Sequence, residues 1–240
     1  MIGAGISYYG NTAPAYLLGN AKVYDGSFDY DDGALWAQLD RTTAHSFNIN
    51  LLITTISGGR EIFMQGNITG GRYSIRIAGG VLNILMQRTA AINELQFTTT
   101  ITAGYNSIII TYAGNGNVGG FNVYVNGITM SKTTIANTLT SSIISATTSF
   151  RIGARNNTPI TFILGRIRQL EIINRVASPT EIALASITGS FQGAGTVSNA
   201  EYLLAVDFDK TGTANLTTRA STPTYTITAQ GGAAYTQYLP

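Results

Sequence analysis

The sequence contains no cysteine, and this absence excludes two ways of holding a small β domain together. Without thiols there is neither a disulfide framework nor a metal centre built from thiolates. The fold must therefore depend on its own hydrophobic core. A chain of 240 residues is long enough to bury such a core without covalent staples.

Charge is also scarce, since charged residues make up only 11% of the chain, against about 25% in an average globular protein. The formal net charge of +2 is too small to indicate a nucleic acid or an anionic membrane as partner. Thr, Ser, Asn and Gly must cover the surface instead, which suits β structure in a crowded or extracellular setting. Alternation along strands predicts that the densest basic residues are solvated and lie on different faces: Arg151, Arg155, Arg166, Arg168 and Arg175.

Catalytic patterns are missing as well. His45 is the only histidine, and we expect it to be structural rather than the base of a nucleophilic triad. No nucleophile elbow, phosphate-binding loop or dinucleotide fingerprint occurs. A glycosidase needs two carboxylates about 5–9 Å apart, yet no glutamate has a second acid two or four positions away. The sequence predicts a protein that is not an enzyme.

Long apolar runs are absent, so no membrane span is predicted. Residues 1–20 have neither a basic start nor a long apolar stretch, and we expect no signal peptide. They are interpreted as an N-terminal arm. Residues 21–240 are interpreted as one domain, since all-β domains of this length are often single units.

Two hairpins give the clearest signals among the features that are present. In Tyr73–Met86, two alternating runs flank Gly79-Gly80, and in Gly120–Met130, two such runs flank Asn126-Gly127. Two-residue turns of this kind require positive φ, which Gly and Asn adopt at low cost.

One helix is predicted over residues 178–187. Ser178 and Glu181 form a capping box around Pro179 at the first helical position. Residues 189–198 after it are interpreted as a linker-like stretch. Residues 164–173 show mixed periodicity and are predicted to be a strand. Further strands are predicted at residues 96–103, 106–113, 149–154 and 202–208.

Four stretches carry a resemblance to a known family: residues 22–32, 106–130, 149–182 and 202–212. The most specific is the third, in which a strand, Asn174-Arg175 and the capping box follow one another. This order resembles the laminin-G-like jelly-roll family of the concanavalin A-like lectin/glucanase superfamily. The resemblance implies an all-β, two-sheet antiparallel jelly-roll sandwich with one short helix. It also implies glycans, calcium or proteins as partners, and some relatives on this fold are glycosidases.

Calcium is the only cofactor that the residues favour, because it prefers hard oxygen ligands. Asp25 and Asp29 lie in an acidic turn, and Asp207 and Asp209 share one face of a late strand that could lie beside it. The alternative is that Asp25, Asp31 and Asp32 are turn residues. Aromatic side chains that could contact a ligand or partner are Tyr8, Tyr9 and Trp36, although a place in the core is the favoured alternative for Trp36.

These features lead to a first hypothesis of a non-catalytic component of a phage virion, as a head fibre, decoration or receptor-binding domain. An extracellular type of surface without an export signal suits a protein assembled in the host cytoplasm and released in a particle. Its partners would be other virion proteins or a cell-surface glycan, and it could form a homo-oligomer. The alternatives are a carbohydrate-binding lectin module of a secreted protein and, third, a glycosidase of the same fold.

Overall fold

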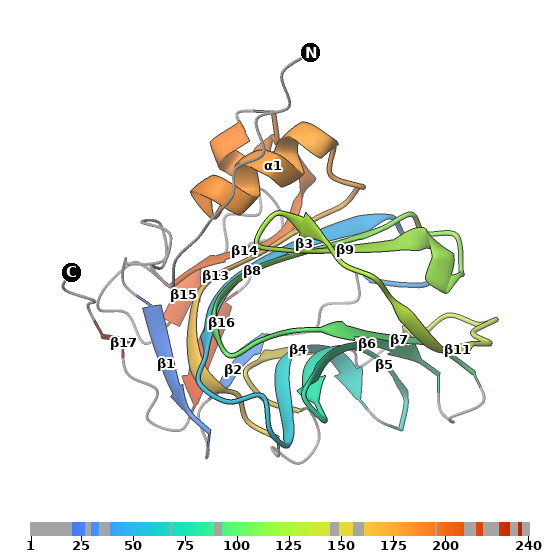
Figure 1. The fold of residues 1–240 in the computed structure, drawn as a ribbon, viewed down its shortest axis with the longest axis horizontal. Helices are drawn as coiled ribbons and strands as arrows, with labels where there is room; N and C mark the ends of the chain where they lie inside the picture. The colour runs from blue at the N-terminus through green and yellow to red at the C-terminus, as the bar shows by residue number, and fades with distance from the viewer. Residues whose placement is uncertain are drawn as a thin grey trace.

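The structure, a computed structural model, describes residues 21–26, 30–33, 39–67, 69–88, 93–144, 149–155, 161–194, 196–208, 215–217, 226–230 and 235–236. These residues form two antiparallel sheets that pack face to face, with one α-helix on the outside of the assembly (Figure 1). The predicted all-β, jelly-roll-like sandwich is therefore confirmed.

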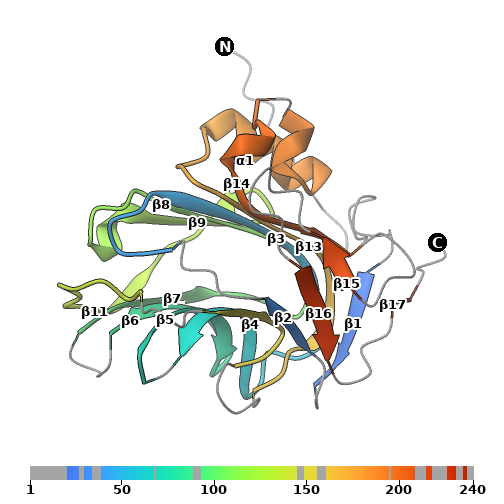
Figure 2. The same cartoon turned by 180° about the vertical axis from the view of Figure 1, so that it is seen from behind.

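The first sheet has eight described strands. Its order is β10 (Ile128–Thr129), β9 (Phe121–Val125), β8 (Gly104–Tyr112), β3 (His45–Ile53), β13 (Leu164–Ile173), β1 (Ala21–Asp25) and β17 (Tyr235–Thr236), and β14 (Tyr202–Asp207) also pairs with β13. Because β3 occupies one edge of β13, β1 and β14 share the other edge end to end. Seen from behind, β1 and β17 lie at the same side of the molecule (Figure 2).

The second sheet has nine described strands. Its order is β11 (Thr133–Asn137), β7 (Glu94–Thr100), β6 (Val81–Gln87), β5 (Gly71–Ala78), β4 (Gly59–Asn67), β12 (Phe150–Ile152), β2 (Tyr30–Gly33), β16 (Thr226–Gln230) and β15 (Asn215–Thr217). Strands β4 to β7 follow one another as neighbouring antiparallel strands, so the centre of this sheet is a simple meander.

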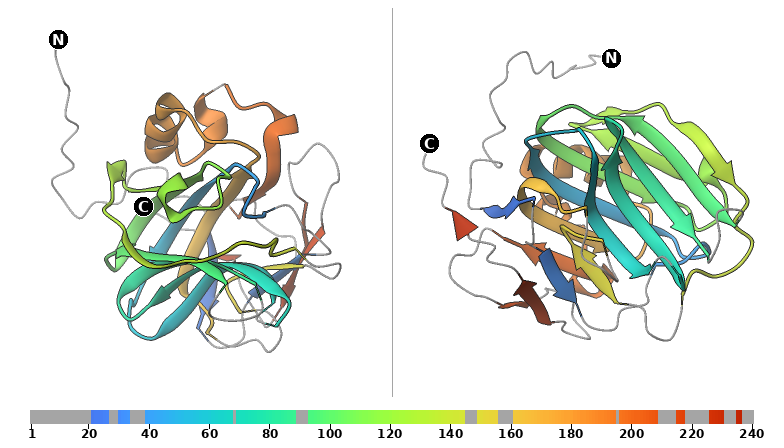
Figure 3. Two further views of the ribbon diagram at one scale, coloured as in Figure 1. Left: turned by 90° about the vertical axis from the view of Figure 1, so that its right-hand side faces the viewer. Right: turned by 90° about the horizontal axis from the view of Figure 1, so that it is seen from below.

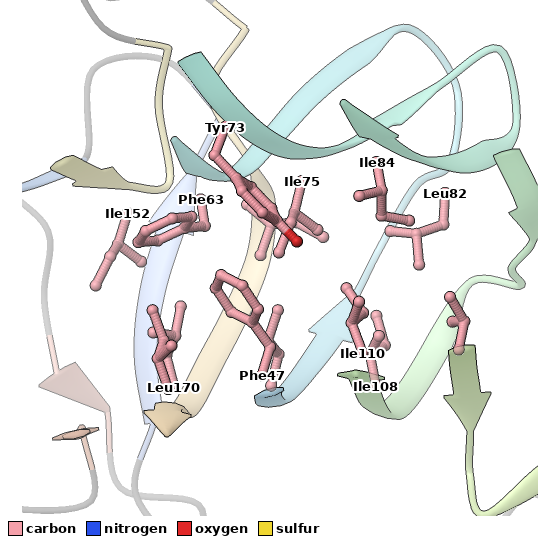
Figure 4. Packing of buried hydrophobic residues seen from close by; sticks show 14 of the residues in the cluster. Phe47, Phe63, Tyr73, Ile75, Leu82, Ile84, Ile108, Ile110, Ile152 and Leu170 are labelled. Atoms are coloured by element: carbon pink, nitrogen blue, oxygen red, sulfur yellow. The ribbon is translucent and has the colours of Figure 1, made fainter. Parts of the chain in front are cut away.

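The core lies between the sheets because alternate side chains of each strand point inward. Phe47 of the first sheet packs against Phe63 and Tyr73 of the second, with ring centroids 5.3 and 5.4 Å apart (Figure 4). All three rings are fully buried. A Cβ on Gly33 would lie 2.0 Å from the ring of Phe150, so the absence of a side chain on β2 makes room for an aromatic residue of the same core.

Both predicted hairpins are present. Ala78 pairs with Val81 around Gly79-Gly80, and all the strand residues between Arg72 and Gln87 are in register. Asn126 and Gly127 have φ of 53° and 78° and join β9 to β10, a strand of only two residues. Positive φ at both turn positions is the geometry that matches the right-handed twist of the flanking strands.

Strand β13 explains why the pattern of residues 164–173 is mixed. Its register against β3 shifts between Ile167 and Gln169, which is a β-bulge. The extra residue changes the phase of the alternation, so Ile167 points into the core before the bulge and Leu170 after it. The prediction of a strand is confirmed, and the bulge accounts for the spacing that resembles a helix.

Helix α1 (Pro179–Thr188) begins and ends as its sequence indicates. The Ser178 hydroxyl accepts from the Glu181 N–H at 3.3 Å, the Glu181 carboxylate accepts from the Ser178 N–H at 2.8 Å, and Gly189 ends the helix in the left-handed conformation. The stretch after it is not a linker. Phe191, in the 3₁₀-helix η3 (Phe191–Ala194), is fully buried with Ile182 and Ala185 in a second apolar cluster. No helix in the described part of the chain is long and apolar enough to cross a membrane.

Candidate functional site

The two outer faces of the sandwich differ. Helix α1 and the 3₁₀-helices η3 and η4 (Asn199–Glu201) lie over the outer face of the eight-stranded sheet (Figure 1). Seen from the opposite side, the cyan and green strands β4 to β7 of the nine-stranded sheet lie in front, and no helix crosses them (Figure 3, right). The second face is therefore the one that the described fold leaves open to a ligand.

The polar residues beneath α1 serve to attach it. Glu171 is fully buried, yet its carboxylate accepts hydrogen bonds from Asn48 at 2.9 Å, from Gln169 at 2.7 Å and from the Phe191 N–H at 2.8 Å. Asn48 also donates to the Gly189 carbonyl at the end of α1 at 2.8 Å. Buried polar groups that satisfy one another in this way fix the position of an element rather than receive a ligand.

The open face is defined here by the outward-pointing residues of β4 to β7. Two of these residues, Met64 and Leu85, are apolar. The others are polar or charged although most of them are buried: Glu61, Arg72, Ser74, Arg76, Asn83, Gln87, Glu94, Gln96 and Thr98. Cross-strand pairing sets them in rows, one of which runs Glu61, Arg76, Asn83, Thr98. Among the described elements, no helix packs on this row.

Glu61 is the most perturbed acid of the open face. Its carboxylate accepts a short hydrogen bond from the Ser74 hydroxyl. Burial raises the pKa of Glu61 to about 7, although Ser74 and the nearby charges of Arg76, Arg72 and Arg155 act in the opposite direction. Burial, followed by repulsion from Arg155 and Arg76, lowers the pKa of Arg72 to about 10. The open face therefore places several positive charges near Glu61, a carboxyl group whose ionisation is disfavoured by burial.

An ion pair without net charge lies at the border of the open face, on β12 and β2. Arg151 forms a salt bridge with Asp32, its neighbour in register, and its guanidinium lies 4.6 Å from the ring centroid of Tyr30. Asp31, the next residue, is buried and accepts from the Tyr24 hydroxyl at 2.6 Å. Asp31 and Asp32 are thus strand residues with structural partners, and the alternative that they are turn residues is wrong.

The register does not bring the two described residues of the predicted calcium site together. Asp25 lies opposite Leu164 and Asp207 opposite Gln169 on the same edge of β13. Five residues of strand separate these positions by about 16 Å, whereas calcium ligands lie about 2.3–2.6 Å from the ion. The strands meet end to end rather than side by side, so one ion cannot join this pair. No group of three or more His, Asp or Glu that could hold a metal ion occurs in the described ranges.

The remaining predicted site residues lie outside the described residues: Tyr8, Tyr9, Asp29, Trp36 and Asp209. Their roles stay predictions, as does the N-terminal arm over residues 1–20. His45 is placed as expected, inside the core. Its ring bonds to the Thr43 carbonyl at 2.8 Å and lies 3.3 Å from the Tyr73 hydroxyl, and burial lowers its pKa to about 4.

Arg72 and Arg76 of the open face are absent from the set of basic residues that the sequence analysis singled out. Arg155, which follows β12, belongs to that set. The sequence feature that could have identified them is the spacing of Arg72 and Arg76, because residues four apart on a strand share a face. Both lie in the correctly predicted hairpin. Of the basic residues predicted to be scattered and solvated, Arg175 instead bridges Glu181 and Glu201, and Arg151 pairs with Asp32.

Comparisons with known proteins agree with this architecture. A laminin-G-type family model of the concanavalin A-like lectin/glucanases superfamily matches residues 18–183. No protein with a curated description matches the chain in sequence. A solved structure from Bacteroides ovatus, of a protein that has been proposed to bind carbohydrate, is similar with a TM-score of 0.61 at 13% identity. The match covers 91% of this chain and 60% of that one, so the chain spans less than two thirds of that structure.

A second similar structure is the heptameric SAP-like pentraxin of Limulus polyphemus. It is 13% identical with a TM-score of 0.50, over 71% of this chain and 82% of the pentraxin. At this identity the likeness concerns the fold alone.

Proposed function

Since this chain belongs to the concanavalin A-like lectin/glucanase superfamily, we propose that it is a non-catalytic domain that binds a glycan on the open face of the nine-stranded sheet. The observation that carries the proposal is the asymmetry of the sandwich. One outer face is covered by α1, and the other presents rows of polar side chains with no helix across them. Sugars bind through hydrogen bonds to such fixed polar groups.

The arrangement of acids supports binding rather than hydrolysis. The outward-facing acids on the described strands of this sheet are Asp32, Glu61 and Glu94. Asp32 is engaged by Arg151, and Glu94 accepts from Gln87 at 2.8 Å. Glu61 and Glu94 lie three strands apart, which is about 14 Å and beyond the separation of roughly 5–9.5 Å that glycoside hydrolysis requires.

A glycan array followed by chemical-shift mapping tests this proposal. We expect saturable binding of at least one glycan, with shifted backbone amides concentrated in β4 to β7 and unshifted amides in α1. The same fold in a protein proposed to bind carbohydrate makes glycans the first ligand class to test. Shifts confined to α1 or to the eight-stranded sheet would place the site elsewhere, and a complete lack of glycan binding would overturn the proposed function.

For the biological setting we retain the proposal of a phage virion component that displays this domain. It is supported by the low content of charged residues, 11% of the chain, and by the absence of cysteine. Co-sedimentation of the protein with phage particles, detected by a specific antibody, is the expected result. Failure to find it in any particle fraction, together with recovery as a freely secreted protein, would favour the secreted lectin module.

A further inference from the structure

Three arginines gather at one place on the open face. Arg72 and Arg76 flank Ser74 on β5, and Arg155 follows β12 closely enough to act on the charges of both Arg72 and Glu61. Register places Asn83 of β6 directly opposite Arg76. We call Arg72, Arg76, Arg155 and Asn83 the arginine cluster.

The arginine cluster has unused hydrogen-bonding atoms in buried positions. The Nε atoms of Arg72, Arg76 and Arg155 and the Oδ1 atom of Asn83 have no hydrogen-bond partner among the described residues. Arg72 is only 9% exposed and Asn83 only 4%. A buried polar atom without a partner is unfavourable, and more so when it belongs to a charged group, so the gathering of several in one cluster supports a partner outside the chain.

The positive charge of the cluster is also not neutralised. Two other arginines of the described chain have close carboxylate partners: Arg175 lies 2.7 Å from Glu181, and Arg151 bonds to Asp32. Within the described ranges, no ion pair joins Arg72, Arg76 or Arg155 to an acid. Glu61, the nearest carboxylate, is bonded to Ser74 instead. The acids that act on the charge of Arg72, Glu61 and Glu94, form no ion pair with it among the described residues, so the guanidinium groups of the cluster are not paired.

We propose that the arginine cluster binds the anionic group, a carboxylate or a sulfate, of an acidic saccharide. Guanidinium groups match the paired oxygens of such anions through bidentate, charge-assisted hydrogen bonds. The side-chain amide of Asn83 can bond to a neighbouring sugar hydroxyl. This inference rests on the proposed function and narrows its ligand class to acidic sugars.

A simpler role is that the arginine stems merely cover the apolar side chains of Met64 and Leu85, which are buried although they point outward. Methionine keeps an unbranched stem of similar length and removes the guanidinium. The substitutions Arg72→Met and Arg76→Met therefore separate covering from anion binding. Arg166→Met is the matched control, because it removes one positive charge from β13 in the other sheet.

The probes are an oligogalacturonate, a sulfated oligosaccharide and a neutral oligosaccharide of the same length, measured by calorimetry on the full chain. We expect at least one acidic probe to bind roughly tenfold or more tightly than the neutral one, because hydrogen bonds to charged groups contribute that much. Arg72→Met and Arg76→Met should each weaken this binding by a similar factor, whereas Arg166→Met should not change it. Preference for the carboxylate or the sulfate probe identifies the anion.

The salt dependence of the unmodified protein gives a measurement that needs no variant. Affinity for the acidic probe should fall as sodium chloride rises from 50 to 500 mM, because exposed charges are screened. Arg76→Lys, which keeps the charge but loses the planar fork, should bind at an intermediate level. Equal binding of neutral and acidic probes, unaffected by salt and by both methionine variants, overturns the inference and leaves the proposed function standing. Binding of no saccharide of any charge overturns both.

Discussion

At the scale of single residues, burial decides whether a polar side chain serves structure or function. His45 and Glu61 are both buried, and burial favours the neutral form of each. It lowers the pKa of His45 and raises the pKa of Glu61. His45 is surrounded by rings, with centroids 5.3 Å away in Tyr73 and Tyr112 and 5.7 Å away in Phe47. Glu61 instead lies on the outer face, among arginines. The same physical effect therefore marks a structural residue in one case and a site in the other.

The buried His45 predicts a loss of stability in acid. Its pKa is about 4 in the folded protein against 6.5 in the unfolded chain. Below pH 6.5 the unfolded chain binds more protons, so the stability from the neutral ring is full above pH 6.5 and is lost progressively towards pH 4. The loss due to His45 should reach about 3 kcal/mol, whereas Glu61, whose pKa is raised to about 7, contributes in the opposite direction as pH falls. Urea unfolding at a series of pH values measures it.

The control for this prediction is His45→Gln, which keeps a hydrogen-bonding side chain but does not titrate. The variant should be less stable at pH 7, and relative to the wild type it should gain stability as pH falls from 6.5 to 4. An identical slope for both proteins in this range would show that other groups cause the acid sensitivity.

At the scale of elements, α1 is held by two helix caps that share one arginine. Ser178 and Glu181 cap the start of α1, and at the start of η4 the Glu201 carboxylate accepts from both the backbone N–H and the hydroxyl of Ser198. Arg175 donates to Glu181 at 2.8 and 2.7 Å and also bonds to Glu201. These hydrogen bonds lower the pKa of Glu181 and raise that of Arg175. The arginine therefore ties two helical turns to the end of β13.

We expect Arg175→Met to lower the free energy of unfolding by about 2 kcal/mol at pH 7, because the buried Glu181 loses charged hydrogen bonds. The pKa of Glu181 is lowered in the folded state, so this contribution is present above about pH 4.5 and is lost as pH falls further. Urea unfolding at pH 7 and pH 3 measures the difference. Ser178→Ala, which removes only one cap, should cost about 1 kcal/mol. A variant as stable as the wild type at pH 7 would contradict the role of Arg175.

Elements with local signals could be predicted from the sequence, and arrangements set by distant strands could not. The hairpin turns and the capping box of α1 are encoded in neighbouring residues, and each was found where predicted. The bulge in β13 appears only when β3 lies beside it. Three members of the arginine cluster lie in the predicted β5–β6 hairpin, whereas Arg155 joins them only through the pairing of β12 with β4, which the sequence does not reveal.

At the scale of the whole molecule, stability and binding belong to opposite faces. Helix α1 covers the eight-stranded sheet, and the proposed site lies on the outer side of the other sheet. Changes at these two places do not touch each other, so their effects on free energy should add.

Additivity predicts that the acidic saccharide stabilises Arg175→Met by the same increment as the wild type. At a ligand concentration of 100 times Kd this increment is about 2.7 kcal/mol. Urea unfolding of both proteins with and without the ligand measures it, and the neutral oligosaccharide serves as the control. A much smaller increment in Arg175→Met would mean that α1 and the binding face are coupled.

The end-to-end placement of β1 and β14 on one edge of β13 has a consequence for biosynthesis. When β1 leaves the ribosome, its partner residues Ile167 to Leu164 have not been made. The same holds for its later neighbour β17. Strand β1 therefore stays unpaired while most of the chain is translated. We expect closure of the sandwich to be slow and to follow synthesis rather than accompany it.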